Sequence, residues 1–208
     1  MRHLLQGQIV LAISSTYICI YNKGDRKMRI LQEETIALVI DYQEKLVPVM
    51  HKEDDLIQST EIFLRGLEVL KIPSIVTQQY TKGIGMTVKQ LQDVYADNFT
   101  YFDKSSFSCL DDEIISAKIR EYNKKNIIIC GIEAHVCVLQ TAIDCIGAGY
   151  QVIIVEDCIS SRRKNDKKIA LQRAAREGVV LTTYESLLFE LTRRSGNDTF
   201  KQISKLIK

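Results

Sequence analysis

Histidine is scarce in this sequence, and the cysteines follow no metal-binding pattern. The 208 residues include only three histidines, at positions 3, 51 and 135, and six cysteines with no CxxC pair and no Cys/His set at zinc spacing. These absences argue against a zinc site and against a His-rich metal centre. The irregular spacing indicates reduced intracellular thiols. We therefore expect the protein to work without a cofactor.

The chain also lacks an excess of either charge. Lys and Arg total 28 against 26 Asp and Glu, a net charge of +2, which gives no electrostatic footprint for nucleic acid or an anionic membrane. We expect a small-molecule substrate, with neither nucleic acid nor membrane as a partner. The length suits one domain that buries most of its apolar surface, and we find no internal repeat, low-complexity tract or linker.

The first 27 residues differ in character from the rest. Residues 9–21 are moderately apolar, but this stretch is shorter than the roughly 20 residues that span a bilayer, and no small-x-small cleavage pattern follows it. We interpret residues 1–27 as an N-terminal extension, either poorly packed or an upstream start, and residues 28–208 as the globular domain. We expect a cytoplasmic protein, with organellar targeting by residues 1–27 as the alternative.

Strand and helix patterns alternate from residue 28 onward. The expected strands are short and continuously hydrophobic, which is typical of parallel strands buried on both faces. The alternation predicts an α/β fold, namely a three-layer, doubly wound and mostly parallel sheet with helices on both faces. Such folds bind ligands outside the carboxyl ends of their strands. Strands are expected at 36–40, 74–77, 127–130, 152–155 and 179–182. A loop-rich stretch is expected after the second strand, through residue 103. Helices are expected at about 56–70, 111–123, 138–146, 167–177, 184–193 and 199–207.

Cys137 follows the expected strand 127–130 and lies at or near the start of the next helix. The unpaired backbone N–H groups of a helix N-terminus favour a thiolate and can hold a developing oxyanion, which is the chemistry of a cysteine hydrolase. Gly131 would let the backbone bend between the strand and the helix. Position alone is equally compatible with a buried structural thiol.

Two further ionisable residues occupy comparable positions. Asp41 directly follows the strand sequence ALVI, where a helix cap or turn residue is the alternative. Lys104 lies among aromatic and small residues in FDKSSFS, where a surface lysine is the alternative. With Cys137 they supply what amide hydrolysis by a thiol requires: a nucleophile, a base, and a cation that lowers the pKa of the thiol and keeps the base ionised.

Three motifs in this order, ALVIDYQ, FDKSSFS and CGIEAHVC, resemble the isochorismatase-like cysteine hydrolases, a superfamily that includes nicotinamidases and carbamoylsarcosine amidohydrolases. The segments TQQYTKGIG, VEDCISSR and FKQISKLIK make the isochorismatase domain-containing proteins the most similar subgroup. The resemblance covers residues 28–208. It implies that Asp41, Lys104 and Cys137 form a catalytic triad. It also implies a cis peptide between Ile132 and Glu133 that turns the backbone amides of Glu133 and Cys137 toward one point, as an oxyanion hole.

Two positions depart from the family pattern. Nicotinamidases carry an Asp-x-His metal motif where this sequence has Thr77-Gln78-Gln79-Tyr80, so we expect no metal and a substrate other than nicotinamide. Gln78 or Gln79 could point an amide into the substrate pocket, or pack as a structural polar residue. The family often has an aromatic residue five positions after the aspartate. Here that residue is Leu46, so we expect a pocket of different shape.

Together these features predict a metal-independent cysteine hydrolase that acts on a small amide, carbamoyl or related C–N substrate through a thioester, and that forms a homo-oligomer. The retained thiol argues against hydrolysis of isochorismate itself, since some isochorismatases lack it. The main alternative is a catalytically silent binding or scaffold protein with the same fold. A redox thiol, with Cys130 or Cys145 resolving an oxidised Cys137, ranks lowest.

Overall fold

The computed structural model describes residues 29–208, so the expected extension 1–27 lies outside the described residues. The strands are β1 (Thr35–Ile40), β2 (Ser74–Gln79), β3 (Phe102–Lys104), β4 (Asn126–Ile132), β5 (Gln151–Ser160) and β6 (Val180–Thr182). The α-helices are α1 (Glu53–Val69), α2 (Thr81–Ile84), α3 (Lys89–Gln92), α4 (Glu113–Glu121), α5 (Leu139–Gly147), α6 (Lys164–Arg176), α7 (Tyr184–Thr192) and α8 (Asp198–Ile207). Short helical turns are η1 (Gln32–Glu34), η2 (Val47–Val49), η3 (Ala96–Asn98) and η4 (Ala134–Val138).

The six strands form one sheet in the order β3-β2-β1-β4-β5-β6. Every neighbouring pair of strands is parallel. The order reverses between β1 and β4, and in doubly wound folds such a switch point opens a crevice outside the carboxyl ends of the two strands. The expected α/β class and doubly wound sheet are confirmed, and this crevice is the place to look for a site.

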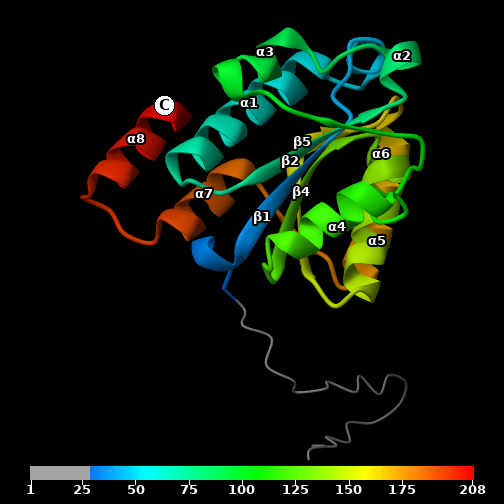
Figure 1. Ribbon diagram of the computed structural model, residues 1–208. Coiled ribbons are helices and arrows are strands. Elements are labelled where there is room, and N and C mark those ends of the chain that lie inside the picture. Colours follow the sequence, from blue (N-terminus) through cyan, green and yellow to red (C-terminus); the bar gives the residue numbers. More distant parts are fainter. Residues whose placement is uncertain (1–28) are drawn as a thin grey trace, which may run out of the picture.

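Helices cover both faces of the sheet, with α1, α7 and α8 on one side and α4, α5 and α6 on the other (Figure 1). All residues of β1 and β4 are buried, as expected for central strands with two covered faces. Successive residues of β1 enter opposite cores because side chains alternate along a strand. Ala37 and Val39 belong to the core under α1, whereas Ile36, Leu38 and Ile40 belong to the core under α5.

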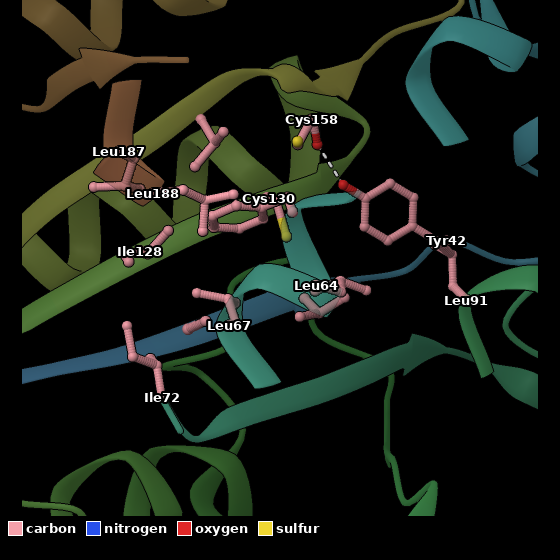
Figure 2. Packing of buried hydrophobic residues seen from close by; sticks show 14 of the residues in the cluster. Tyr42, Leu64, Leu67, Ile72, Leu91, Ile128, Cys130, Cys158, Leu187 and Leu188 are labelled. Atoms are coloured by element: carbon pink, nitrogen blue, oxygen red, sulfur yellow. Dashed lines mark hydrogen bonds between the residues drawn. The ribbon is translucent and has the colours of Figure 1, made fainter. Parts of the chain in front are cut away.

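The core under α1 is built mainly from aliphatic side chains, together with Phe63 and a buried tyrosine, Tyr42 (Figure 2). The hydroxyl of Tyr42, the residue after Asp41, donates a hydrogen bond to the backbone carbonyl of Cys158 and accepts one from Thr60 Oγ1. This contact ties the loop after β1 to the carboxyl end of β5. Around it, the figure shows Leu64 and Leu67 of α1, Ile128 and Cys130 of β4, and Leu187 and Leu188 of α7.

Two local features differ from the sequence expectation. The sequence predicts a loop through residue 103, whereas β3 forms there as a three-residue edge strand that pairs only with β2. The sequence predicts a strand that ends at residue 155, whereas β5 runs to Ser160. Cys137 lies near a helix start as expected, in the π-helical turn η4 that directly precedes α5. Short or irregular elements carry too few residues to show a hydrophobic period.

The carboxyl ends of β1 and β4 approach each other closely at Gly131. This residue pairs in register with Ile40 and has a φ of 147°. A Cβ atom at position 131 would lie 2.5 Å from the carbonyl oxygen of Ile40. Only glycine fits, both because of its backbone conformation and because of this contact.

Replacing Gly131 with alanine should therefore lower the free energy of unfolding by roughly 3–5 kcal/mol, through backbone strain and a clash with backbone atoms that cannot yield. Gly149→Ala is the matched control, because its φ of 91° is also positive but no heavy atom lies within 4 Å of the added Cβ. It should cost about 1–2 kcal/mol. Urea unfolding of both variants measures the difference, and equal losses would contradict the steric explanation.

Candidate active site

The carboxyl ends of three parallel strands, on the same side of the sheet as the crevice at the switch point, bring together the predicted catalytic residues. Asp41 follows β1, Lys104 ends β3, and Cys137 lies in η4 after β4. Lys104 Nζ lies 2.7 Å from Asp41 Oδ2 and 3.7 Å from Cys137 Sγ. The side chains of Asp41 and Lys104 are fully buried, and Cys137 is 6% exposed. A cation therefore contacts a carboxylate and a thiol within the protein interior.

The Asp41 carboxylate is held through both of its oxygens. Oδ1 accepts a hydrogen bond from Thr77 Oγ1 at 2.8 Å, and Oδ2 faces Lys104. Thr77 lies on β2 and is positioned by the sheet, where it pairs in register with Ile40 of β1. The aspartate itself has a positive φ of 56°. These contacts fix the direction of the carboxylate, and Thr77 joins the site although its side chain was not singled out from the sequence.

Lys104 is surrounded by acceptors. Beyond Asp41 and Cys137, its ammonium donates to Gln79 Oε1 at 2.6 Å and to the carbonyl oxygen of Ser106 at 3.2 Å. Burial lowers the pKa of the Lys104 ammonium, but its acidic neighbours, first of all the charge of the Asp41 carboxylate, outweigh burial, so the pKa lies above its ordinary value. The lysine stays protonated and supplies a fixed positive charge.

The Cys137 thiol is protonated in this arrangement. Burial raises its pKa most, the Asp41 carboxylate raises it further, and Lys104 lowers it only in part. The expectation that Lys104 lowers the pKa of the thiol is right in direction. Desolvation and the carboxylate outweigh the lysine, so the pKa of the thiol lies above its ordinary value.

The backbone around the thiol is tightly folded. The peptide bond between Ile132 and Glu133 is cis. The N–H groups of Val136 and Val138 both donate to the Glu133 carbonyl, at 3.0 and 3.3 Å, and the second bond has the five-residue spacing of a π-helical turn. This turn sets the position of Cys137 relative to the end of β4.

The Glu133 side chain anchors the same turn to the loop before α6. Arg162 donates to its carboxylate from Nη2 at 2.9 Å and from its backbone N–H at 3.1 Å. Burial raises the pKa of Glu133, but the bonds from Arg162 outweigh burial and place the pKa below its usual value. His135 Nδ1 lies 3.0 Å from Ser161 Oγ, so its ring is engaged with the same loop. The Arg162 side chain is 63% exposed, so this ion pair lies at the surface of the protein.

The three predicted pocket residues have different environments. Gln79 reaches the site through Lys104. Gln78 is fully buried, and its amide bridges the hydroxyls of Thr87 and Thr81 at 2.9 and 2.8 Å. Leu46 packs against the core under α1. Of the three, only Gln79 contacts the Asp41, Lys104 and Cys137 group.

Gln43 contributes to the site but was not found from the sequence. Its fully buried amide donates to the carbonyl oxygens of Gln79 and Gly85, at 3.0 and 2.7 Å, and accepts from the Gln79 N–H at 2.7 Å. These bonds fix the end of β2 beside Lys104. The only signal in the sequence was its place two residues after Asp41 in ALVIDYQ.

Neither a metal cluster nor a membrane-spanning helix is found in residues 29–208. No group of three or more His, Cys, Asp or Glu side chains in this range could hold a metal ion. No helix in the same range is long and apolar enough to cross a membrane.

Known proteins are similar to this chain in both sequence and fold. The isochorismatase domain family matches residues 35–186. Isochorismatase domain-containing protein 1 from Danio rerio is 38% identical over 174 residues, which make up 84% of this chain and 61% of that protein. This chain thus spans less than two thirds of that relative's length. The structure of MAR1 ribonuclease from Caenorhabditis elegans is 36% identical with a TM-score of 0.80, covering 86% of this chain and 92% of that one.

YcaC from Escherichia coli, described as an octameric hydrolase of unknown specificity, has a TM-score of 0.82 over 88% of this chain and 91% of its own. At 22% identity this likeness shows the fold alone. Fold and sequence together define a hydrolase domain of the isochorismatase type. The chain belongs to the isochorismatase family, as its motifs indicated.

The raised pKa of the thiol predicts how Cys137 reacts. Its alkylation by iodoacetamide should keep accelerating with pH beyond about pH 9, where an ordinary cysteine is already mostly thiolate. Lys104→Met should slow the reaction further, because it removes the charge that lowers the pKa of the thiol. Lys205→Met, an exposed change on α8, should have no effect. Peptide mass spectrometry gives the rate at Cys137, and a plateau at mildly acidic pH would contradict the protonated thiol.

Proposed function

We propose that this protein is a metal-independent cysteine hydrolase that cleaves a small amide, carbamoyl or related C–N substrate through a thioester. The observation that carries the proposal is the placement of Lys104 Nζ within 2.7 Å of Asp41 and 3.7 Å of Cys137. These contacts bring a base (Asp41), a nucleophile (Cys137) and a counter-charge (Lys104) together in one buried place. Structural packing of a cysteine requires neither charged group.

In the proposed first step, substrate binds with its carbonyl carbon next to Cys137 Sγ. Asp41 accepts the thiol proton as sulfur attacks, and the carbonyl electron pair moves onto oxygen. The backbone amides of Glu133 and Cys137 hold that oxyanion. Lys104 offsets the negative charge, which passes from the carboxylate to the substrate oxygen.

In the second half of the reaction, Asp41 returns its proton to the departing nitrogen, so the C–N bond breaks and a neutral amine leaves. The acyl group stays on Cys137 as a thioester. Asp41 then accepts a proton from water, which attacks the thioester carbonyl and releases the acid. The thiol regains its proton, and each proton taken up by Asp41 is returned within the cycle.

The absence of a metal from this mechanism rests on the residues at the end of β2. The Asp-x-His motif of nicotinamidases is replaced here by a stretch in which Gln79 donates to Ser105 and accepts from Lys104. An amide that already binds the catalytic lysine is poorly suited to replace a carboxylate or an imidazole as a metal ligand. The same substitution argues for a substrate other than nicotinamide.

Activity should depend on both members of the base and nucleophile pair. On a substrate found by screening amides and carbamoyl compounds, Cys137→Ala and Asp41→Asn should each lower kcat at least about a hundredfold, and Lys205→Met should leave it unchanged. An acyl adduct on Cys137, trapped by acid quench, should appear by mass spectrometry. Full turnover by Cys137→Ala would rule out covalent catalysis.

RNA belongs in the same screen, because the C. elegans relative is named a ribonuclease. The near-neutral charge of this chain and its buried triad favour a small substrate instead. A protein that turns over none of these compounds and forms no acyl adduct on Cys137 would support the silent scaffold.

We propose that the protein assembles as a homo-oligomer. Strand β6 lies at the edge of the sheet, and Val180 and Leu181 on it are each 39% exposed. Consecutive residues of a strand point to opposite faces, so both faces of this edge expose an apolar side chain. The related YcaC is described as octameric. Light scattering on the purified chain should give a mass above one protomer, and a monomer would contradict assembly.

We propose an intracellular, cytoplasmic location. The described cysteines are all free and buried. Free thiols on neighbouring strands persist most readily in a reducing compartment.

A further inference from the structure

A cavity of about 450 Å³ lies away from the candidate active site. It opens beyond the carboxyl end of β5, between the start of α1, the first turns of α6 and the start of α7. None of Asp41, Lys104 or Cys137 lines it. Its volume falls within the roughly 300–1,000 Å³ that is usual for small-molecule sites.

Lys167 faces this cavity without a hydrogen-bond or ion-pair partner among the described residues. Within residues 29–208 its ammonium makes no hydrogen bond or ion pair, although the side chain is half-buried. Burial lowers the pKa of Lys167 more than the nearby carboxylates of Glu156 and Asp157 raise it. A partly desolvated ammonium without an acceptor has a hydrogen-bonding requirement that a ligand can meet.

Asp157 is the acidic counterpart across the same space. Its Oδ1 accepts a hydrogen bond from the backbone N–H of Tyr184 at 2.9 Å, and burial raises the pKa of the carboxyl group. Lys167 and Asp157 act on each other's pKa, but they form no ion pair with each other. The other charged pair of the lining, Lys52 and Asp55, is neutralised internally at 2.8 Å. Lys167 and Asp157 are thus left as one positive and one negative site.

We propose that this cavity is a second binding site, for a small zwitterion of the amino-acid type, whose carboxylate contacts Lys167 and whose ammonium contacts Asp157. The remaining wall includes Leu56, Ile62 and Ile159, which suit an apolar side chain on the ligand. Charge-assisted hydrogen bonds to half-buried groups are the contacts that fix ligand orientation in such sites. The site does not depend on the triad being active.

Titration of the full-length protein with L-leucine and with two truncated analogues tests the proposal. The analogue 4-methylpentanoate lacks the ammonium, and 3-methylbutylamine lacks the carboxylate. L-Leucine should bind saturably by ligand-observed NMR, with each analogue weaker by about tenfold or more, since each loses one charge-assisted contact. Absence of saturable leucine binding would overturn the site, and equal binding of either analogue would overturn the zwitterion assignment.

Two variants and two controls locate the ligand. Lys167→Met and Asp157→Asn should each weaken leucine binding by about tenfold or more. Lys168→Met, an exposed neighbour in the sequence, and Glu113→Gln, an exposed change on α4, should leave it unchanged. Leucine affinity that survives both Lys167→Met and Asp157→Asn would overturn the assignment.

A measurement on the unaltered protein covers variants that fail to fold. Saturating leucine should lower the acetylation of Lys167 by acetic anhydride relative to that of Lys168, as read by peptide mass spectrometry. Lys168 is the internal reference because the amine of leucine also consumes the reagent. An unchanged ratio of Lys167 to Lys168 acetylation would overturn the contact.

Discussion

The buried ion pair between Asp41 and Lys104 constrains the site more than any other contact. Moving two charges out of water carries a penalty of several kcal/mol for each ion, which is offset only when the remaining lone pairs and protons also find partners. Thr77 donates to the carboxylate, and Gln79 and Ser106 accept from the ammonium. Loss of either charged residue would leave the other as an uncompensated buried charge, which typically lowers the free energy of unfolding by roughly 3–5 kcal/mol. The ends of β1, β2 and β3 are therefore held in one arrangement.

That ion pair also decides the state of the thiol. With Asp41 ionised, Lys104 protonated and Cys137 neutral, the three side chains together carry no net charge. A thiolate would add an uncompensated negative charge beside a carboxylate in a poorly solvated space, which is why the pKa of the thiol is raised. Proton transfer from sulfur thus becomes favourable only when the electron pair can move on to a substrate. In this arrangement the cysteine is protected from oxidants that require a thiolate.

The sequence located the centre of the site because Asp41 and Cys137 each follow a long buried strand. Strands β1 and β4 have clear hydrophobic runs, and the carboxyl ends of parallel strands share one edge of the sheet. Lys104 was found from its aromatic and small neighbours, although its own strand was missed. That strand has three residues, too few for a periodic pattern.

The supporting contacts could not be read from the sequence, because they join segments far apart in the chain. Thr77 and Asp41 are 36 residues apart, and Arg162 and Glu133 are 29 apart. No local pattern marks such pairs before the register of the sheet is known. The net rise of the thiol pKa could not be predicted for a similar reason. The helix position and the lysine were visible in the sequence, whereas the depth of burial is a property of the whole fold.

The separation of the charged partners along the chain has a consequence for folding. Asp41 and Lys104 are 63 residues apart, and Lys104 and Cys137 are 33 apart, so long loops must close before either contact forms. During synthesis β1 emerges before its sheet neighbours β2 and β4, and Asp41 remains hydrated until Lys104 and Cys137 dock beside it. Until β2 and β4 dock, the nascent chain therefore exposes β1, a run of six mostly apolar residues with both edges unpaired. During this period the protein is most prone to aggregate.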